Sequence, residues 1–123
     1  MMNKLYHEVP KIYVAGKLND MACDYIKNMH TMIQTAEKVR KSGFAVFVPG
    51  IDFLQALVFG NWEYNDYFDN SQPWLLASDG VFLCDNWEES KGTQREIELA
   101  KEYEIPVFYG DLKELKDYFD GSK

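Results

Sequence analysis

The chain has 123 residues, of which 46% are hydrophobic, and its formal net charge is −7. This length and apolar content predict one domain with its own core, spanning residues 1–123, and exclude an intrinsically disordered chain. The negative charge argues against binding to a nucleic acid polymer, because phosphate neutralisation supplies most of that affinity. A small anionic ligand remains compatible, since a few amides and one or two cations can hold a phosphate.

The composition also bears on location and cofactors. No stretch approaches the ~20 apolar residues of a membrane span, and the first ten residues lack the core of a signal peptide. The two cysteines, Cys23 and Cys84, follow no metal-binding spacing, and Cys84 lies in an apolar run typical of a small buried side chain. We therefore expect a cytoplasmic protein with no membrane contact, no metal and no cofactor.

The first elements in the chain are a strand and a long helix. Residues 12–15 form a short apolar run ended by Gly16, which predicts a buried strand. The helical pattern that follows has apolar residues three and four apart, at Ala22, Tyr25, Ile26, Met29, Met32, Ile33, Ala36 and Val39. Asn19 or Asp20 is expected to cap its start, and Gly43 to supply a left-handed stop.

The remaining elements alternate in the same way. We expect strands at 44–48, 80–84 and 105–109, and helices at 93–104 and 111–119, the last capped by Asp111 and Glu114. The aromatic-rich segment 51–78 is interpreted as one or two helices with a connecting loop. The order predicts a three-layer, Rossmann-like or flavodoxin-like α/β domain, with a mostly parallel sheet of four to five strands.

Ligands of such sheets bind at the carboxyl ends of the strands. Gly16-Lys17, Pro49-Gly50 and the 85–93 loop are expected to lie there. Lys17 is interpreted either as a phosphate contact or as a solvated charge. Trp87, which follows the third strand, is interpreted either as a stacking surface for a base or as packing over a neighbouring loop.

The most informative segment is 86–100, where a strand leads into a helix. Ser90, Gly92 and Thr93 offer small side chains and backbone amides at the predicted helix start, which can receive an anion. Glu96 lies one turn further along. Thr93-x-x-Glu96 also fits a capping box, in which Glu96 only bonds back to the Thr93 amide, and the residues by themselves leave both interpretations open.

This segment resembles the nucleoside 2-deoxyribosyltransferase-like superfamily, whose motif is D/S-x-G-x-x-x-E at a strand-to-helix turn. Here the motif corresponds to Ser90-Lys91-Gly92-Thr93-Gln94-Arg95-Glu96. WEESKG at 87–92, followed by E-x-x-x-A, is closer still to the DUF4406 branch, which is common in phage and bacterial genomes. KIYVAG at 11–16, the helix around Tyr25 and Asn28, and GFAVFVP at 43–49 also match, so the resemblance covers roughly residues 11–109.

The resemblance implies a role for each matching position. Glu96 falls at the position of a nucleophile that attacks the anomeric carbon of a (deoxy)ribose, and Tyr13 at that of a tyrosine that orients it. Gly16 and Lys17 fall in a loop that helps hold a 5′ phosphate. Ser90 matches the serine that contacts phosphate in the 2′-deoxynucleoside 5′-monophosphate N-hydrolases, where the transferases have Asp.

One position departs from the superfamily pattern. An acid that protonates the leaving base is usual eight residues before the Asp that precedes the third strand, and counting back from Asp79 gives Ser71. Asp69, two residues earlier, is the substitute candidate. If the acid is missing, base protonation is weakened and the domain binds its ligand without turning it over.

The sequence is therefore compatible with three functions. The first is an enzyme, an N-glycoside hydrolase or a deoxyribosyltransferase acting on a nucleoside or nucleotide through Glu96, Tyr13 and Asp69. The second is a non-catalytic module that binds or sequesters a nucleotide, and the third is an interaction protein that docks a partner through its aromatic segment. A homo-oligomer, most simply a dimer, is expected because the rings of residues 53–74 exceed the needs of so small a core.

Overall fold

Every strand pairing in the central sheet is parallel. The computed structural model describes residues 5–17, 22–49, 55–56 and 58–121, and within them four strands lie in the order β2-β1-β3-β4. The elements in chain order are η1 (Tyr6–Glu8), β1 (Lys11–Ala15), α1 (Ala22–Lys41), β2 (Ala45–Phe47), α3 (Tyr64–Leu76), β3 (Gly80–Leu83), η2 (Trp87–Glu89), α4 (Lys91–Glu102), β4 (Val107–Phe108) and α5 (Leu112–Gly121). The predicted α/β fold with a parallel sheet is confirmed.

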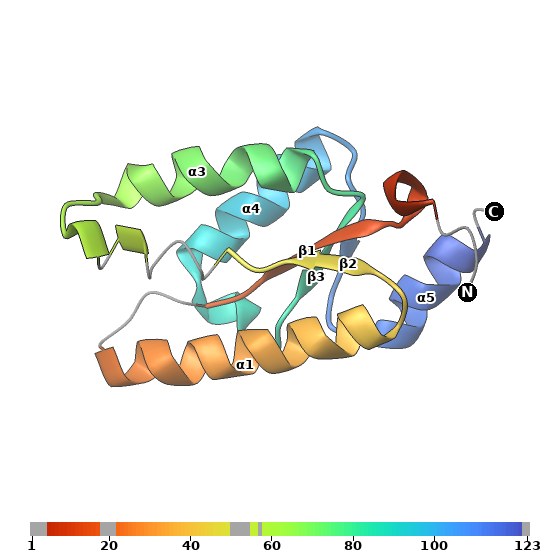
Figure 1. Ribbon diagram of the computed structural model, residues 1–123, viewed down its shortest axis with the longest axis horizontal. Helices are drawn as coiled ribbons and strands as arrows, with labels where there is room; N and C mark the ends of the chain where they lie inside the picture. The colour runs from red at the N-terminus through yellow and green to blue at the C-terminus, as the bar shows by residue number, and fades with distance from the viewer. Residues whose placement is uncertain (1–4, 18–21, 50–54, 57, 122–123) are drawn as a thin grey trace.

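Helices cover both faces of this sheet, because successive strand side chains point to opposite sides. Figure 1 shows α3 and α4 on one side and α1 and α5 on the other. The buried cluster on the first side consists of Tyr13, Ala15, Leu75, Val81, Leu83, Ile97 and Ala100. The buried clusters on the second side consist of Ile12, Val39, Phe44, Phe82, Phe108 and Leu115, and of Val14, Met32, Ala36 and Cys84.

Helix α1 buries a narrower stripe than the sequence pattern predicts. Its buried side chains include Tyr25, Met32, Ala36 and Val39. The prediction of a buried side chain is wrong at two positions of the stripe, because Ile26 is 68% exposed and Ile33 is 55% exposed. Each follows a buried or half-buried position by one residue, or about 100° around the helix, which turns it away from the sheet.

The end of α1 agrees with expectation. Gly43 has a φ of +104°, and its N–H donates to the Arg40 carbonyl at 3.0 Å. Glycine adopts this left-handed conformation without a side-chain penalty, so it stops the helix. The expected caps at the other end, Asn19 and Asp20, lie outside the described residues.

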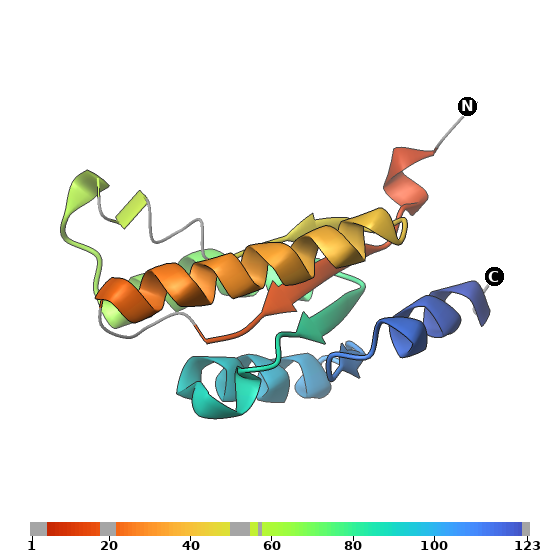
Figure 2. The same ribbon diagram turned by 90° about the horizontal axis from the view of Figure 1, so that it is seen from below.

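The later elements shift by one or two residues from their predicted bounds. Helix α4 begins at Lys91, two residues earlier than expected, because Ser90 is its N-cap. Asp111 caps α5, since its Oδ1 accepts from the amides of Lys113 and Glu114 at 2.9 and 3.2 Å. In the middle segment, α3 and the helical residues 55–56 and 58–59 confirm the expected helices. Figure 2 shows η1 and the last turns of α5 at the same end of the molecule.

Candidate active site

The strand order points to one place for a ligand. Within the sheet, β2 lies next to β1 on one side, and β3 and β4 follow on the other side of β1. The direction in which the chain adds strands therefore reverses between β1 and β3. In open parallel α/β sheets, ligands bind outside the carboxyl ends of the two strands at such a switch point. The loops that follow β1 and β3 meet there, because the Lys17 amide donates to Asn86 Oδ1 at 3.2 Å. Gly50, expected at the same edge, lies outside the described residues.

Tyr13 and Glu96 form a buried pair beside this edge. Tyr13 lies in β1 with no exposed surface, and Glu96, on α4, is 9% exposed. The Tyr13 hydroxyl donates a hydrogen bond to Glu96 Oε2. Burial raises the pKa of Glu96 from 4.5 to about 7, although the hydrogen bond from Tyr13 acts to lower it. The two residues that the sequence placed 83 positions apart are therefore in direct contact.

The capping-box interpretation of Glu96 is wrong. Ser90 is the N-cap of α4, and its Oγ accepts from the Thr93 amide at 3.1 Å. Thr93 is therefore inside the helix, and Glu96 is its sixth residue, too far along to bond back to the capping position. The carboxyl of Glu96 bonds Tyr13 instead.

The three small residues singled out in the sequence lie at the start of α4, with Ser90 as its N-cap and Gly92 and Thr93 in its first turn. Thr93 is 1% exposed, and its Oγ1 has no hydrogen-bond partner within the described part of the chain. Thr93 and Glu96 are three residues apart and share the buried face of the helix. Gly92 lies against Phe68 of α3, whose Cζ would be 3.5 Å from an added Cβ. Arg95 packs over the same Phe68 ring at 4.2 Å from its centroid.

Lys17 and Trp87 lie at the same edge but already contact protein. Lys17 Nζ is 3.3 Å from Glu89 Oε1, and the Lys17 side chain is 23% exposed. Trp87 is half-buried and meets Tyr109 edge to face, with ring centroids 5.3 Å apart. This is the packing expected of Trp87, whereas its stacking on a base stays a prediction.

Ser71, which stands at the expected position of the acid, and Asp69, the substitute candidate, are both on α3 but differ in burial. Ser71 is buried, with 5% of its surface exposed, and Asp69 is exposed. Asp66 caps α3, because its Oδ2 accepts from the Glu63 amide at 2.7 Å. The role of Asp69 therefore stays a prediction.

Sequence reasoning missed the residues that support Tyr13. Phe47 of β2 stacks on the Tyr13 ring at 5.6 Å, and Trp74 of α3 stacks on Phe47 at 5.5 Å. It also missed Asn86 as the group that joins the two loops. The available signal was a polar side chain soon after a buried strand that ends at the ligand-binding edge.

The model of DUF4406, a domain of unknown function, matches residues 10–109. The chain belongs to this family. The match takes in Tyr13, the Ser90–Thr93 turn and Glu96, and it ends before α5. No curated protein and no solved structure matches the chain.

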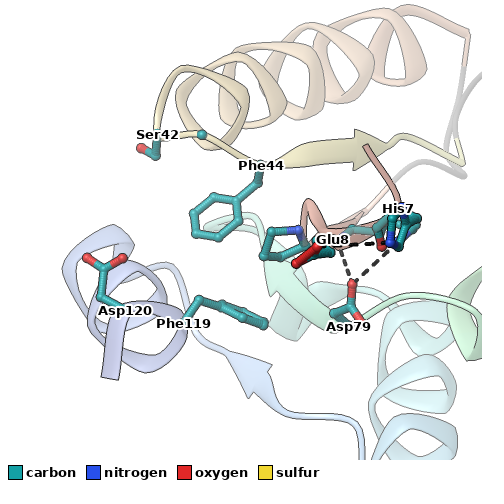
Figure 3. Close-up of a pocket in the computed structure, with 10 residues that line it drawn as sticks. His7, Glu8, Ser42, Phe44, Asp79, Phe119 and Asp120 are labelled. Carbon is teal, nitrogen blue, oxygen red and sulfur yellow. Dashed lines mark hydrogen bonds and ion pairs between the residues drawn. The ribbon is translucent and has the colours of Figure 1, made fainter. Parts of the chain in front are cut away.

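A hollow of this DUF4406 domain lies at the opposite edge of the sheet. It has a volume of about 510 Å³ and is lined by residues from η1, the start of β1, the end of α1 and α5. Figure 3 shows Phe44 and Phe119 forming one wall, with Asp79 at the other side. Asp79 accepts from the Lys11 amide at 2.8 Å and lies 4.0 Å from its Nζ, so these polar groups pair with each other.

Two further findings concern the described residues alone. Among them, no group of three or more His, Cys, Asp or Glu side chains is arranged to hold a metal ion. None of the helices in the same part of the chain has the length and apolar character needed to cross a lipid bilayer.

Proposed function

We propose that the chain is a nucleotide N-glycosidase in which Glu96 is the nucleophile. The observation that carries this proposal is the buried Tyr13–Glu96 pair, which lies beside the switch point of a parallel sheet. A buried carboxyl with a raised pKa and a dedicated hydrogen-bond donor is typical of an active site. The resemblance of 90–96 to the nucleoside 2-deoxyribosyltransferase-like motif supports the same assignment.

The proposed reaction has two steps. The Glu96 carboxylate attacks the anomeric carbon of the sugar, the bond to the base nitrogen breaks with its electron pair, and the base takes up a proton as it leaves. Tyr13 holds Oε2, so Oε1 forms the new bond. In a hydrolase, water then attacks the same carbon, releases the carboxylate and gives up one proton. In a deoxyribosyltransferase, the nitrogen of a second base takes the place of water.

The proposed substrate carries a phosphate. The start of α4 offers backbone amides and the Ser90 hydroxyl, and helix N-termini favour anions. The buried Thr93 hydroxyl beside them has no hydrogen-bond partner among the described residues. Lys17 lies at the same edge. We expect a 2′-deoxynucleoside 5′-monophosphate to bind more tightly than the bare nucleoside, measured by calorimetry. Equal affinities for the two would contradict this part of the proposal.

A second candidate function is a nucleotide-binding module without turnover. Its support is specific, since Ser71 replaces the expected acid and Asp69 is exposed. Without a proton donor the base is a poorer leaving group, and binding then remains as the function.

The deciding experiment measures release of free base by chromatography. The protein is incubated with a panel of nucleosides and nucleoside monophosphates, alongside Glu96→Gln. Base release should fall by orders of magnitude in Glu96→Gln, because an amide oxygen is a poor nucleophile.

The matched control is Glu98→Gln, which makes the same change at an exposed position of α4. It should release base at the wild-type rate. Undiminished release from Glu96→Gln would remove Glu96 from the mechanism. No release from the wild type would favour the binding module.

A further inference from the structure

Three segments are joined by side-chain amides at the carboxyl edge of the sheet. Asn86 follows β3, Lys17 follows β1, and Asn28 lies on α1. Asn86 Oδ1 accepts from the Lys17 amide at 3.2 Å, and Asn86 Nδ2 donates to Asn28 Oδ1 at 3.3 Å. The segments after β1 and β3 approach closely because residue 16 is glycine, since an added Cβ would lie 2.8 Å from Cys84 Cβ and 3.1 Å from Asn86 Oδ1.

This chain of hydrogen bonds fixes the orientation of both amides. The Lys17 amide is a donor, so the atom of Asn86 that faces it must be the oxygen. The nitrogen of Asn86 then faces Asn28, so the atom of Asn28 that accepts its hydrogen bond must also be an oxygen. The nitrogen of Asn28 is therefore the atom left without an acceptor in this chain of hydrogen bonds. Exchanging the oxygen and nitrogen of either side chain would place two donors opposite each other, so one donor would still be unpaired.

The Asn28 nitrogen is buried and unpaired. Within the described residues, no group accepts a hydrogen bond from Asn28 Nδ2. A buried donor without an acceptor destabilises the folded state, so native structures rarely keep one without a partner from solvent or a ligand. Asn86 joins Asn28 to the loops that follow β1 and β3, and the switch point where ligands of this architecture bind lies between these two strands.

We propose that Asn28 is a ligand-binding residue that donates a hydrogen bond from Nδ2 to an acceptor oxygen of the nucleotide. This assignment rests on the ligand class of the proposed function but not on its chemical step. Asn28 contributes to affinity, while Glu96 and Tyr13 carry the chemistry.

The test is the substitution Asn28→Asp. The aspartate keeps the oxygen that Asn86 contacts and replaces the donor nitrogen with a second oxygen, which repels an acceptor. Binding is measured by calorimetry in the Glu96→Gln background, so no turnover is needed. The probes are 2′-deoxyguanosine 5′-monophosphate and 2′-deoxyguanosine. The matched control is Gln34→Glu, the same amide-to-carboxylate change at an exposed position of the same helix.

The dissociation constant for the monophosphate should rise at least tenfold in Asn28→Asp and by less than twofold in Gln34→Glu. A rise for the monophosphate alone identifies a phosphate oxygen as the acceptor, and a rise for both probes identifies an oxygen of the sugar or base. Asn28→Ala, which adds no charge, should also weaken binding if Asn28→Asp fails to fold.

Unchanged affinity in a folded Asn28 variant would overturn the proposal and leave a bound water as the partner of Nδ2. Failure of the wild type to bind either probe would overturn it as well. The proposed glycosidase can fail separately, because tight binding that depends on Asn28 without any base release removes the chemistry and keeps this assignment.

Discussion

Two opposing influences act on the Glu96 carboxyl. Burial disfavours its charged form and raises its pKa, while the Tyr13 hydroxyl stabilises the charged form and lowers it, with a net value of about 7. Both protonation states are therefore populated near neutral pH. A nucleophile must be deprotonated, so base release through Glu96 should increase as the pH rises through about 7.

Replacing Tyr13 tests the balance at this residue. Tyr13→Phe removes the hydrogen bond that lowers the pKa of Glu96 and leaves the effect of burial unopposed, so the pKa should move above its wild-type value. The measurement is a carbon NMR titration of the Glu96 carboxyl. Tyr103→Phe is the control, because Tyr103 is 58% exposed and should leave the titration unchanged. A downward movement in Tyr13→Phe would show that the hydroxyl does not stabilise the carboxylate.

The same carboxyl predicts a pH dependence of stability. Its pKa is about 7 in the folded state, against 4.5 for an ordinary glutamate carboxyl, so the folded state holds the proton more tightly. The contribution to the free energy of unfolding is complete below about pH 4.5 and is lost as the pH rises to about 7. The loss is about 3 kcal/mol at most. Urea denaturation across this range should show the decline in the wild type and a flatter profile in Glu96→Gln, and identical profiles would contradict the prediction.

At the scale of elements, the close approach of the β1 and β3 loops depends on one glycine. Gly16→Ala would place a Cβ 2.8 Å from Cys84 Cβ, so a loop must move, and overpacking of this kind costs about 1–3 kcal/mol. Thermal melting should show a lower Tm and calorimetry a weaker affinity for the monophosphate. Gly92→Ala is the control for stability, because the added Cβ would lie 3.5 Å from its nearest neighbour, Phe68 Cζ. Gly92 also lies in helix α4, where alanine is favoured over glycine. A Tm equal to the wild type in Gly16→Ala would count against this packing.

The start of α4 shows how a small shift changes the interpretation of a residue. The sequence offers both Ser90 and Thr93 as caps, because either side chain can accept an amide hydrogen bond. Local pattern does not separate them. The structure selects Ser90, and the shift of three residues moves Glu96 from a capping position to the buried face, where it meets Tyr13.

At the scale of the whole molecule, large apolar side chains in and near the aromatic-rich segment remain exposed. Val58 is 82%, Phe59 is 71% and Trp74 is 56% exposed. We expect a dimer at micromolar concentration, because exposed apolar patches mark interaction surfaces. Sedimentation should show Phe59→Ser shifting the equilibrium toward monomer, while Tyr103→Ser, at the end of α4, should leave it unchanged. A monomeric wild type would refute this expectation.

The sequence by itself determined the order of strands and helices along the chain, the parallel pairing of the strands and the glycine stop at Gly43. These follow from local patterns, in which continuous apolar runs form covered strands and spacings of three and four form helices. The tertiary structure decided which α1 residues are buried, which cap begins α4, and that Asn28 retains a donor with no partner among the described residues. Burial and hydrogen-bond pairing depend on groups far apart in the chain. Tyr13 and Glu96 are separated by 83 positions, and only the packing of α4 against β1 brings them together.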